Sequence, residues 1–307
     1  MLRFLYFINF TLINKKHDSR ALKKIKYIIL RKIANSLVNF LYRLPNKYKK
    51  MGINNNEERQ NKVIVSLTTF PARINVIWIA IESLLRQSYR PDEIILWLAK
   101  DQFNGLESLP KKLIEQQKRG LSIRFCDEDL RSHKKYYYAF KEYPEDIIIT
   151  VDDDVIYPKN TLEVLFELHK IYPDCICCNR AHLIKMNKDK TIDSYKSWTH
   201  NPTGFMGPSK LLCPTGVSGV LYPPNSINLE VFNKDSIKSL CFYADDLWLK
   251  IMSLKNNTRV IKSSNFSYDL FTIESSQKES LGEINVAGNK NDEQLKAILN
   301  KYNVPFE

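Results

Sequence analysis

The chain has 307 residues, 44% of them hydrophobic, and its 46 Lys and Arg outnumber 34 Asp and Glu, for a formal net charge of +12. A chain of this size can bury a core in one large domain or two smaller ones. Residues 1–50 hold 13 Lys and Arg and a single acid, Asp18, so they carry the whole excess and the body after them is neutral. Because a nucleic-acid-binding protein spreads basic residues over its folded face, this distribution argues against nucleic acid as a partner.

Six cysteines are scattered without regular spacing. Cys175 and Cys178 have the interval of a zinc-binding pair, but no second pair supplies the other half of a site. Unpaired cysteines are among the most buried residue types. We therefore predict buried, reduced thiols and a cytoplasmic location.

The basic amino-terminal segment contains two apolar stretches. Residues 1–13 are too few to cross a bilayer, which takes about 20 residues, and no signal cleavage site follows them. Residues 21–44 predict a basic amphipathic helix, which can lie on an anionic membrane surface or pack on the protein's own core. Its apolar positions recur at helical spacing: Leu22, Ile25, Ile29, Ile33, Leu37, Leu41 and Leu44. We expect residues 1–61 to form a membrane-surface segment followed by a polar linker.

From residue 63 onward, apolar strands alternate with helices. The predicted strands are residues 63–68, 93–98, 121–125 and 146–151, and the predicted helices are 73–87, a stretch after Pro110, 136–141 and 160–171. Helical spacing returns at 242–250 and 291–299. This alternation predicts an α/β fold with an open, mostly parallel sheet and helices on both faces.

The apolar run at residues 147–151 leads directly into three carboxylates, Asp152, Asp153 and Asp154, which we call the acidic triplet. Ligands of such sheets bind at the carboxyl ends of the strands. The chain has only nine Gly and neither of the glycine-rich motifs that cradle a diphosphate. Mg²⁺ or Mn²⁺ on Asp152 and Asp154 could neutralise a diphosphate instead, and a solvated acidic turn is the alternative.

Further motifs accompany the triplet: SLTTFPARI at residues 66–74, SHKK at 132–135, GVLYPP at 219–224 and ADDLWL at 244–249. Together they resemble the nucleotide-sugar-dependent glycosyltransferases of the GT-A fold, a Rossmann-type architecture. Within that group they are similar to the bacterial enzymes that assemble capsule or other surface polysaccharides. The resemblance spans residues 62–301. It implies a GT-A glycosyltransferase domain at 62–307, with a nucleotide-binding half at 62–160 and an acceptor-binding half at 161–307.

The resemblance also implies roles in the donor site. The residues placed there are Thr68, Arg73, Lys134, Lys135, Asp152 and Asp153, with Asp152 and Asp154 on the metal. Within this set, Thr68 and Arg73 would line the nucleoside pocket. Lys134, with Lys135 as the second candidate, would face the base or the diphosphate. Lysine and metal together would stabilise the departing nucleoside diphosphate.

Asp245 and Asp246, the acidic pair, lie about 100° apart on a predicted helix, so we expect only one of them to enter the site. We predict Asp246 as the general base that deprotonates the acceptor hydroxyl, which gives a single displacement with inversion. Asp245 is the second candidate for the base, and otherwise a helix cap. The residues expected near the acceptor are Trp198, His200, Gly216, Gly219 and Tyr222. Trp198 and Tyr222 could stack on a sugar, and His200 could be a further metal ligand.

These features lead to one functional hypothesis. The protein would be a metal-dependent glycosyltransferase that moves a sugar from a nucleotide donor, with UDP favoured, to a lipid-linked or polysaccharide acceptor. It would work as a peripheral protein on the cytoplasmic face of the cell membrane, held there by residues 1–50. The alternatives are a retaining enzyme of the same fold, a metal-dependent phosphoesterase or nuclease, and a membrane-bound protein without enzymatic activity.

Overall fold

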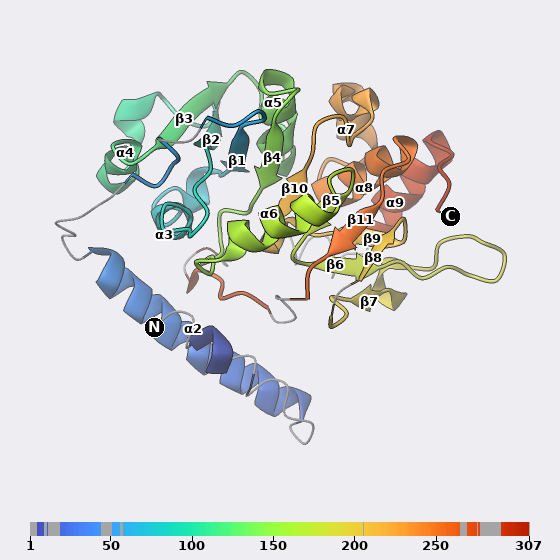
Figure 1. Ribbon diagram of the computed structural model, residues 1–307, viewed down its shortest axis with the longest axis horizontal. Helices are drawn as coiled ribbons and strands as arrows, with labels where there is room; N and C mark the ends of the chain where they lie inside the picture. The colour runs from blue at the N-terminus through green and yellow to red at the C-terminus, as the bar shows by residue number, and fades with distance from the viewer. Residues whose placement is uncertain are drawn as a thin grey trace.

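The computed structural model describes residues 5–8, 11, 19–43, 51–55, 58–204, 206–264, 269–274, 276 and 290–306. An eight-stranded sheet runs through its centre in the order β3-β2-β1-β4-β10-β5-β11-β8 (Figure 1). Its strands are β1 (Val63–Thr68), β2 (Glu93–Ala99), β3 (Leu121–Cys126), β4 (Ile147–Thr150), β5 (Ile176–Cys178), β8 (Met206–Ser209), β10 (Val220–Tyr222) and β11 (Val260–Lys262). The first four strands pair in parallel, as do β5 and β11, whereas β10 and β8 are antiparallel to their neighbours. The predicted α/β fold with a mostly parallel sheet is confirmed.

Helices cover both faces of this sheet, as predicted. They are α2 (Arg20–Arg43), α3 (Trp78–Leu84), α4 (Lys111–Gln117), α5 (Lys134–Glu142), α6 (Thr161–Ile171), α7 (Lys234–Leu240), α8 (Asp245–Lys255) and α9 (Lys290–Lys301). One core holds Val63, Val65 and Leu67 of β1 together with α2, α3 and α6. Ile64 turns to the opposite face, where it packs with Ala139 of α5. Because β1 is buried on both faces, its sequence is a continuous apolar run.

The second half of the chain differs most from the pattern expected of alternating strands and helices. Strand β10 inserts between β4 and β5, so residues from both predicted halves share one continuous sheet. A separate three-stranded antiparallel sheet follows, built from β6 (Ala181–Leu183), β7 (Thr199–His200) and β9 (Leu212–Pro214). These strands have two or three residues each, which is too short for a periodic sequence signal.

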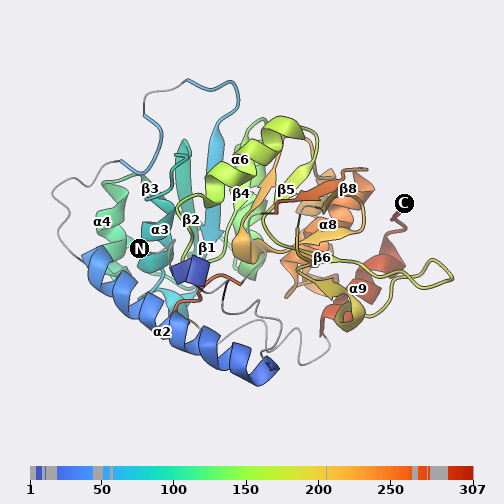
Figure 2. The ribbon, with the colours of Figure 1, turned by 60° about the horizontal axis from the view of Figure 1, so that its bottom comes forward.

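Helix α2 runs along the layer that contains α3 (Figure 2). Leu30, Ala34 and Val38 on one side of it are buried in the main core, so the alternative of a helix packed on the protein's own core holds for this face. Residues 51–55, expected to belong to a linker, also contact the body, because the N–H of Gly52 donates to the Arg119 carbonyl at 2.8 Å. Residues 1–4, 9–10, 12–18, 44–50 and 56–57 of the predicted amino-terminal segment lie outside the described residues. In the described part of the chain, no helix combines the length and the hydrophobicity that crossing a membrane requires.

Candidate active site

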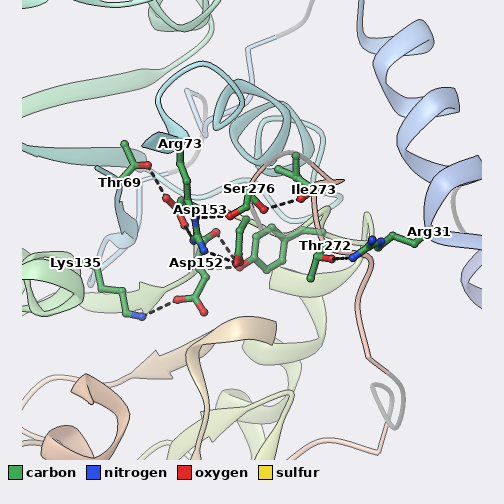
Figure 3. A network of polar contacts seen from close by, with 11 residues as sticks. Arg31, Thr69, Arg73, Lys135, Asp152, Asp153, Thr272, Ile273 and Ser276 are labelled. Atoms are coloured by element: carbon green, nitrogen blue, oxygen red, sulfur yellow. Dashed lines mark hydrogen bonds and ion pairs between the residues drawn. The ribbon is translucent and has the colours of Figure 1, made fainter. Parts of the chain in front are cut away.

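The acidic triplet follows the carboxyl end of β4, next to the residues that follow β1 (Figure 3). Asp153 is 6% exposed and accepts hydrogen bonds from Thr69 Oγ1 and Arg73 Nη1, each at 2.5 Å. Arg73 Nη2 also lies 3.2 Å from Asp154 Oδ2. One arginine from the short 3₁₀ helix Pro71–Arg73 therefore pairs with two carboxylates of the triplet.

Arg73 is itself buried, at 9% exposure, and its Nε donates to the Ser276 carbonyl at 3.1 Å. Burial disfavours the charge of Arg73, but Asp153 and Asp154 more than offset it and raise the pKa of the guanidinium. Burial also raises the pKa of the Asp153 carboxyl above its usual value, against the opposing effect of Arg73. The two groups form a buried ion pair, which is costly to break by removing one partner.

Lys135, in the first turn of α5, joins the triplet to the acidic pair. Its Nζ lies 2.7 Å from Asp152 Oδ1 and 2.9 Å from Asp245 Oδ2, and the residue is 4% exposed. Burial disfavours its charge, yet Asp152, Asp245 and Asp246 raise the pKa of Lys135 well above the ordinary value. The two acidic clusters, more than 90 residues apart in the sequence, are therefore parts of one site.

The acidic pair occupies the first turn of α8. Asp245 is 7% exposed, and burial acts against its charge, but Lys135 and then His133 lower its pKa. Asp246 is partly exposed and accepts a hydrogen bond from the Gly216 N–H at 3.1 Å. Burial, followed by the repulsion from Asp245, raises the pKa of Asp246 to about 8. Asp246 is therefore the member of the pair with the stronger affinity for a proton.

Gly216 lies where the backbone approaches both clusters. A Cβ at this position would be 2.8 Å from Lys135 Nζ and 3.0 Å from Asp152 Oδ1. Real side chains do not tolerate such distances, so a larger residue would displace the lysine or the carboxylate. Gly216 thus lies beside both clusters through its backbone, and its predicted role in acceptor binding stays a prediction.

The exposure of each carboxylate in the triplet bears on whether it can bind the expected metal ion. The Asp152 and Asp154 side chains are 30% and 18% exposed, against 8% for Asp153, so the two predicted metal ligands are the accessible members. Mg²⁺ and Mn²⁺ usually bind one or two protein carboxylates and take their other ligands from phosphate oxygens and water. This donor set fits such an ion. In the part of the chain that the structure describes, no three His, Cys, Asp or Glu side chains are grouped to hold a metal on their own.

Three other predicted residues lie beside the site or away from it. Thr68 ends β1, and its hydroxyl donates to the Trp97 carbonyl at 2.9 Å. Lys134 is 1% exposed and forms an ion pair with Asp129, whereas its neighbour in the sequence meets the triplet. Gly219 has a φ of +88°, and a Cβ there would contact α6, so its role is in the turn before β10.

The two aromatic residues predicted to bind the acceptor are buried in the protein core. Trp198 is 3% exposed, and its indole N–H donates to the Asp193 carbonyl at 3.0 Å. Tyr222 is 4% exposed and belongs to the second core. Neither ring offers a free face on which a sugar could stack, which does not fit the predicted platform. His200 is exposed, and its described contacts are with Tyr195 and His182 rather than with the triplet.

Sequence reasoning missed two residues that contact the triplet, Thr69 and Tyr157, and one that contacts Arg73, Ser276. Thr69 lies inside the SLTTFPARI motif, but the resemblance places its neighbour Thr68 in the donor site. Tyr157 follows the triplet, and its hydroxyl accepts the Asp152 N–H at 2.8 Å and donates to the Asp152 carbonyl at 3.2 Å. Ser276 has no sequence signal, because it contacts Arg73 through its backbone from an aperiodic stretch.

Comparison with known proteins identifies the family. The model of glycosyl transferase family 2 matches residues 66–219, which are 154 of the 307 residues and include the triplet, Arg73, Lys135 and Gly216. The chain belongs to this family. It is a glycosyltransferase, which excludes the phosphoesterase and the non-enzymatic protein that the carboxylates alone had left open. Among curated proteins, none matches the chain.

Comparison with solved structures supports the fold. The mannosyltransferase PcManGT from Pyrobaculum calidifontis, in complex with GDP-Man and Mn²⁺, has a TM-score of 0.50 at 10% identity and aligns with 99% of this chain and 78% of its own. TarS residues 1–349 from S. aureus have a TM-score of 0.43 at 15% identity, over 68% of this chain and 59% of that one. At 10% identity, the likeness to the mannosyltransferase establishes the GT-A-type fold alone. The TM-score with TarS is too low to support a conclusion.

Proposed function

We propose that the protein is a metal-dependent glycosyltransferase that moves a sugar from a nucleotide donor to an acceptor hydroxyl with inversion. The observation that carries this proposal is the position of Lys135, whose Nζ lies 2.7 Å from Asp152 and 2.9 Å from Asp245. One side chain joins the carboxylates proposed for the donor to those proposed for the base. A single displacement needs this closeness, because base and leaving group act at the same anomeric carbon.

In the donor site, Asp152 and Asp154 would hold Mg²⁺ or Mn²⁺. When bound, such an ion supplies positive charge to the diphosphate as it leaves. Arg73 and Lys135 stand beside these carboxylates and stabilise the same developing negative charge. The mannosyltransferase of the same fold is bound to GDP-Man and Mn²⁺, so we propose a nucleotide sugar and a divalent cation here too, with UDP as the first candidate.

Asp246 is the base in this proposal. It accepts the proton of the acceptor hydroxyl, whose oxygen forms a bond to the anomeric carbon while the bond to the diphosphate breaks. Its raised pKa favours this role, because a carboxylate with a higher pKa accepts a proton more readily. Asp245, which is buried and forms an ion pair with Lys135, holds the lysine in place instead.

We further propose that helix α2 holds the enzyme on an anionic membrane, where it would meet a lipid-linked or polysaccharide acceptor in cell-surface polysaccharide assembly. One face of the helix is apolar and exposed. This outer face consists of Leu22, Ile25, Ile29, Ile33 and Phe40, which are 40 to 63% exposed. Lys23, Lys24, Lys26 and Lys32 lie on the same helix. An apolar face with neighbouring lysines is the combination that binds the interface of an anionic bilayer. The location would be the cytoplasmic face of the cell membrane.

A screen of UDP and GDP sugars tests the activity. Hydrolysis or transfer should require Mn²⁺ or Mg²⁺ and stop when EDTA is added, and calorimetry should detect UDP binding that depends on the metal. The anomeric configuration of the product, read by NMR, tests inversion, and retention would rule out Asp246 as the base of a single displacement. Absence of metal-dependent nucleotide binding would refute the proposal.

The membrane proposal needs point variants. Deleting residues 1–50 would also remove Leu30, Ala34 and Val38 from the core. Replacing Ile25, Ile29 and Ile33 with Ser should release the protein from vesicles that contain anionic lipid in a flotation experiment. Unchanged flotation of this triple variant would refute the role of α2.

A further inference from the structure

A segment from the carboxyl-terminal part of the chain lies between helix α2 and the acidic triplet (Figure 3). We call residues 269–274 and Ser276 the return segment. On the side of the triplet, the Ile273 N–H donates to the Asp154 carbonyl at 2.7 Å, and the Ser276 carbonyl accepts a hydrogen bond from Arg73 Nε at 3.1 Å. The return segment therefore holds both the backbone of a proposed metal ligand and the arginine that pairs with that ligand.

Asn35 of α2 forms hydrogen bonds with the other side of the return segment. Its Nδ2 donates to the Thr272 carbonyl at 3.0 Å and to the Arg31 carbonyl at 2.9 Å, while its Oδ1 accepts the Glu274 N–H at 3.0 Å. Asn35 is 4% exposed. Both N–H groups of this buried amide and its oxygen are thus engaged, and two of the three bonds go to the return segment.

Two neighbours of Asn35 on the helix support the same contact. The Tyr27 hydroxyl donates to the Leu270 carbonyl at 3.0 Å. Arg31 Nη1 donates to Thr272 Oγ1 at 3.3 Å (Figure 3). Together with Asn35, these side chains form what we call the inner face of α2. Membrane binding does not require buried polar side chains that form hydrogen bonds with one short segment of the protein. The inner face of α2 therefore has a structural role inside the protein.

The outer face of α2 points away from the inner face and toward solvent. Since successive helical residues turn by about 100°, Ile29 and Ile33 lie about 120° and about 160° around the helix from Asn35. Ile29 and Ile33 are about half exposed, at 52% and 48%, while Asn35 is buried. A membrane can therefore contact the outer face while the inner face keeps its bonds to the return segment.

We propose that Asn35 is a positioning residue of the donor site, which acts through the return segment on Asp154 and Arg73. Helix α2 then has two separate functions on its two faces, membrane contact on the outer face and support of the donor site on the inner one. This inference rests on the proposed metal-dependent donor site. Because Asn35 acts on that site from outside, its loss lowers the affinity for nucleotide and metal and leaves acceptor binding unchanged.

The matched pair Asn35→Leu and Ser36→Ala tests this role. Leucine fills a similar volume without any hydrogen bond, and Ser36 is an exposed neighbour on the same helix. Asn35→Leu should raise the Kd of UDP in saturating Mn²⁺ and the KM of the donor about tenfold, the scale of two lost hydrogen bonds. The KM of the acceptor, the kcat at saturating donor and all constants of Ser36→Ala should stay at wild-type values. A folded Asn35→Leu protein with wild-type UDP affinity would overturn the inference.

Further variants separate the possible failures. If Asn35→Leu does not fold, Tyr27→Phe removes one bond to the return segment and should raise the donor KM about threefold; no rise overturns the inference. The triple Ser variant of Ile25, Ile29 and Ile33 should keep wild-type UDP affinity in solution, and a loss of affinity would show that the outer and inner faces of α2 do not act separately.

Wild-type protein without metal-dependent UDP binding would refute the proposed function itself. Wild-type protein that binds UDP, beside an unchanged Asn35→Leu, refutes the positioning role alone.

Discussion

The acidic triplet and the acidic pair are both runs of adjacent carboxylates, but their charges are compensated differently. Two cations, Arg73 and Lys135, contact the triplet, so each of its three carboxylates has an ion-pair partner. In the pair, Lys135 contacts Asp245, whereas Asp246 accepts the N–H of Gly216. The same sequence feature therefore yields a cation-balanced cluster in one place and a carboxylate with a raised pKa in the other.

This difference is consistent with the distinct roles proposed for the two clusters. A divalent cation can join or replace the side-chain cations around the triplet, which suits the binding of a diphosphate. A carboxylate that favours its proton suits the removal of a proton from a hydroxyl. The number of cations that the fold brings to each cluster, rather than the number of acids, separates the two roles.

The largest effect is expected at Asp246. Asp246→Asn should lower kcat about a thousandfold, since a general base contributes about 10² to 10⁴ in rate, and should leave the Kd of UDP and Mn²⁺ unchanged. Kinetics and calorimetry on the same preparation measure the two quantities. Asp235→Asn is the matched control, because Asp235 is an exposed acid in the first turn of α7. Nucleotide affinity that fell together with kcat would place Asp246 in the donor site instead.

The next effect is on stability and concerns Lys135, which the two clusters share. Lys135→Met should lower the free energy of unfolding by about 3–5 kcal/mol, the usual result of removing one partner from a buried ion pair. Urea unfolding measures this change. Lys170→Met is the control, because the Lys170 and Glu167 side chains are 57% and 64% exposed and their pair should contribute less than about 1 kcal/mol.

The pH dependence of this variant has a definite sign. In the wild type, the lowered pKa of Asp245 contributes stability that is present above its unfolded pKa and lost as the pH falls through its folded pKa. Without Lys135, the buried Asp245 carboxyl resists ionisation, so its pKa should rise above the unfolded value. Lys135→Met should therefore regain stability between pH 7 and pH 5, and a variant that loses stability over that range would contradict this account.

The sequence predicted those parts of the fold that form long apolar runs. All but the last residue of β1 are buried, and β4 is buried throughout, so their patterns are unambiguous. Strand β10 has three residues and enters the sheet from a distant part of the chain, which local periodicity does not report. Periodicity identified the large apolar side chains of α2 that form its exposed outer face, but not its core side, which includes the small Ala34.

In the candidate site, the sequence predicted side chains better than backbone contacts. Asp152 and Asp154 are the predicted metal ligands, and both are the accessible members of the triplet. Arg73 was expected near a nucleoside, and its ion pairs with the triplet were not foreseen. Ser276 and Asn35 have no such signal, because they act through contacts between segments that are far apart in the sequence.

A smaller effect is expected within the triplet. Asp154→Asn should raise the Mn²⁺ concentration needed for half-maximal UDP binding about a hundredfold, because even residues that only support metal ligands cost about 10- to 100-fold in affinity. Asp153→Asn should instead lower the melting temperature, since Asp153 is buried with Arg73 and Thr69, and keep the metal dependence. Calorimetry at several Mn²⁺ concentrations distinguishes the two variants. Equal loss of metal affinity in both would show that the three acids act as one ligand set.

The smallest effect is the response of the wild-type enzyme to pH. Since burial and Asp245 raise the pKa of Asp246 to about 8, its carboxyl is protonated below that pH and cannot accept the proton of the acceptor. The kcat/KM for transfer should therefore rise about tenfold per pH unit below about pH 8 and level off above it. The Kd of UDP in saturating Mn²⁺ should change far less over the same range, because the carboxylates of the triplet keep their cations. A flat kcat/KM profile from pH 6 to 9, with Asp246→Asn inactive, would contradict the raised pKa of Asp246, because kcat/KM reports the pKa values of the free enzyme.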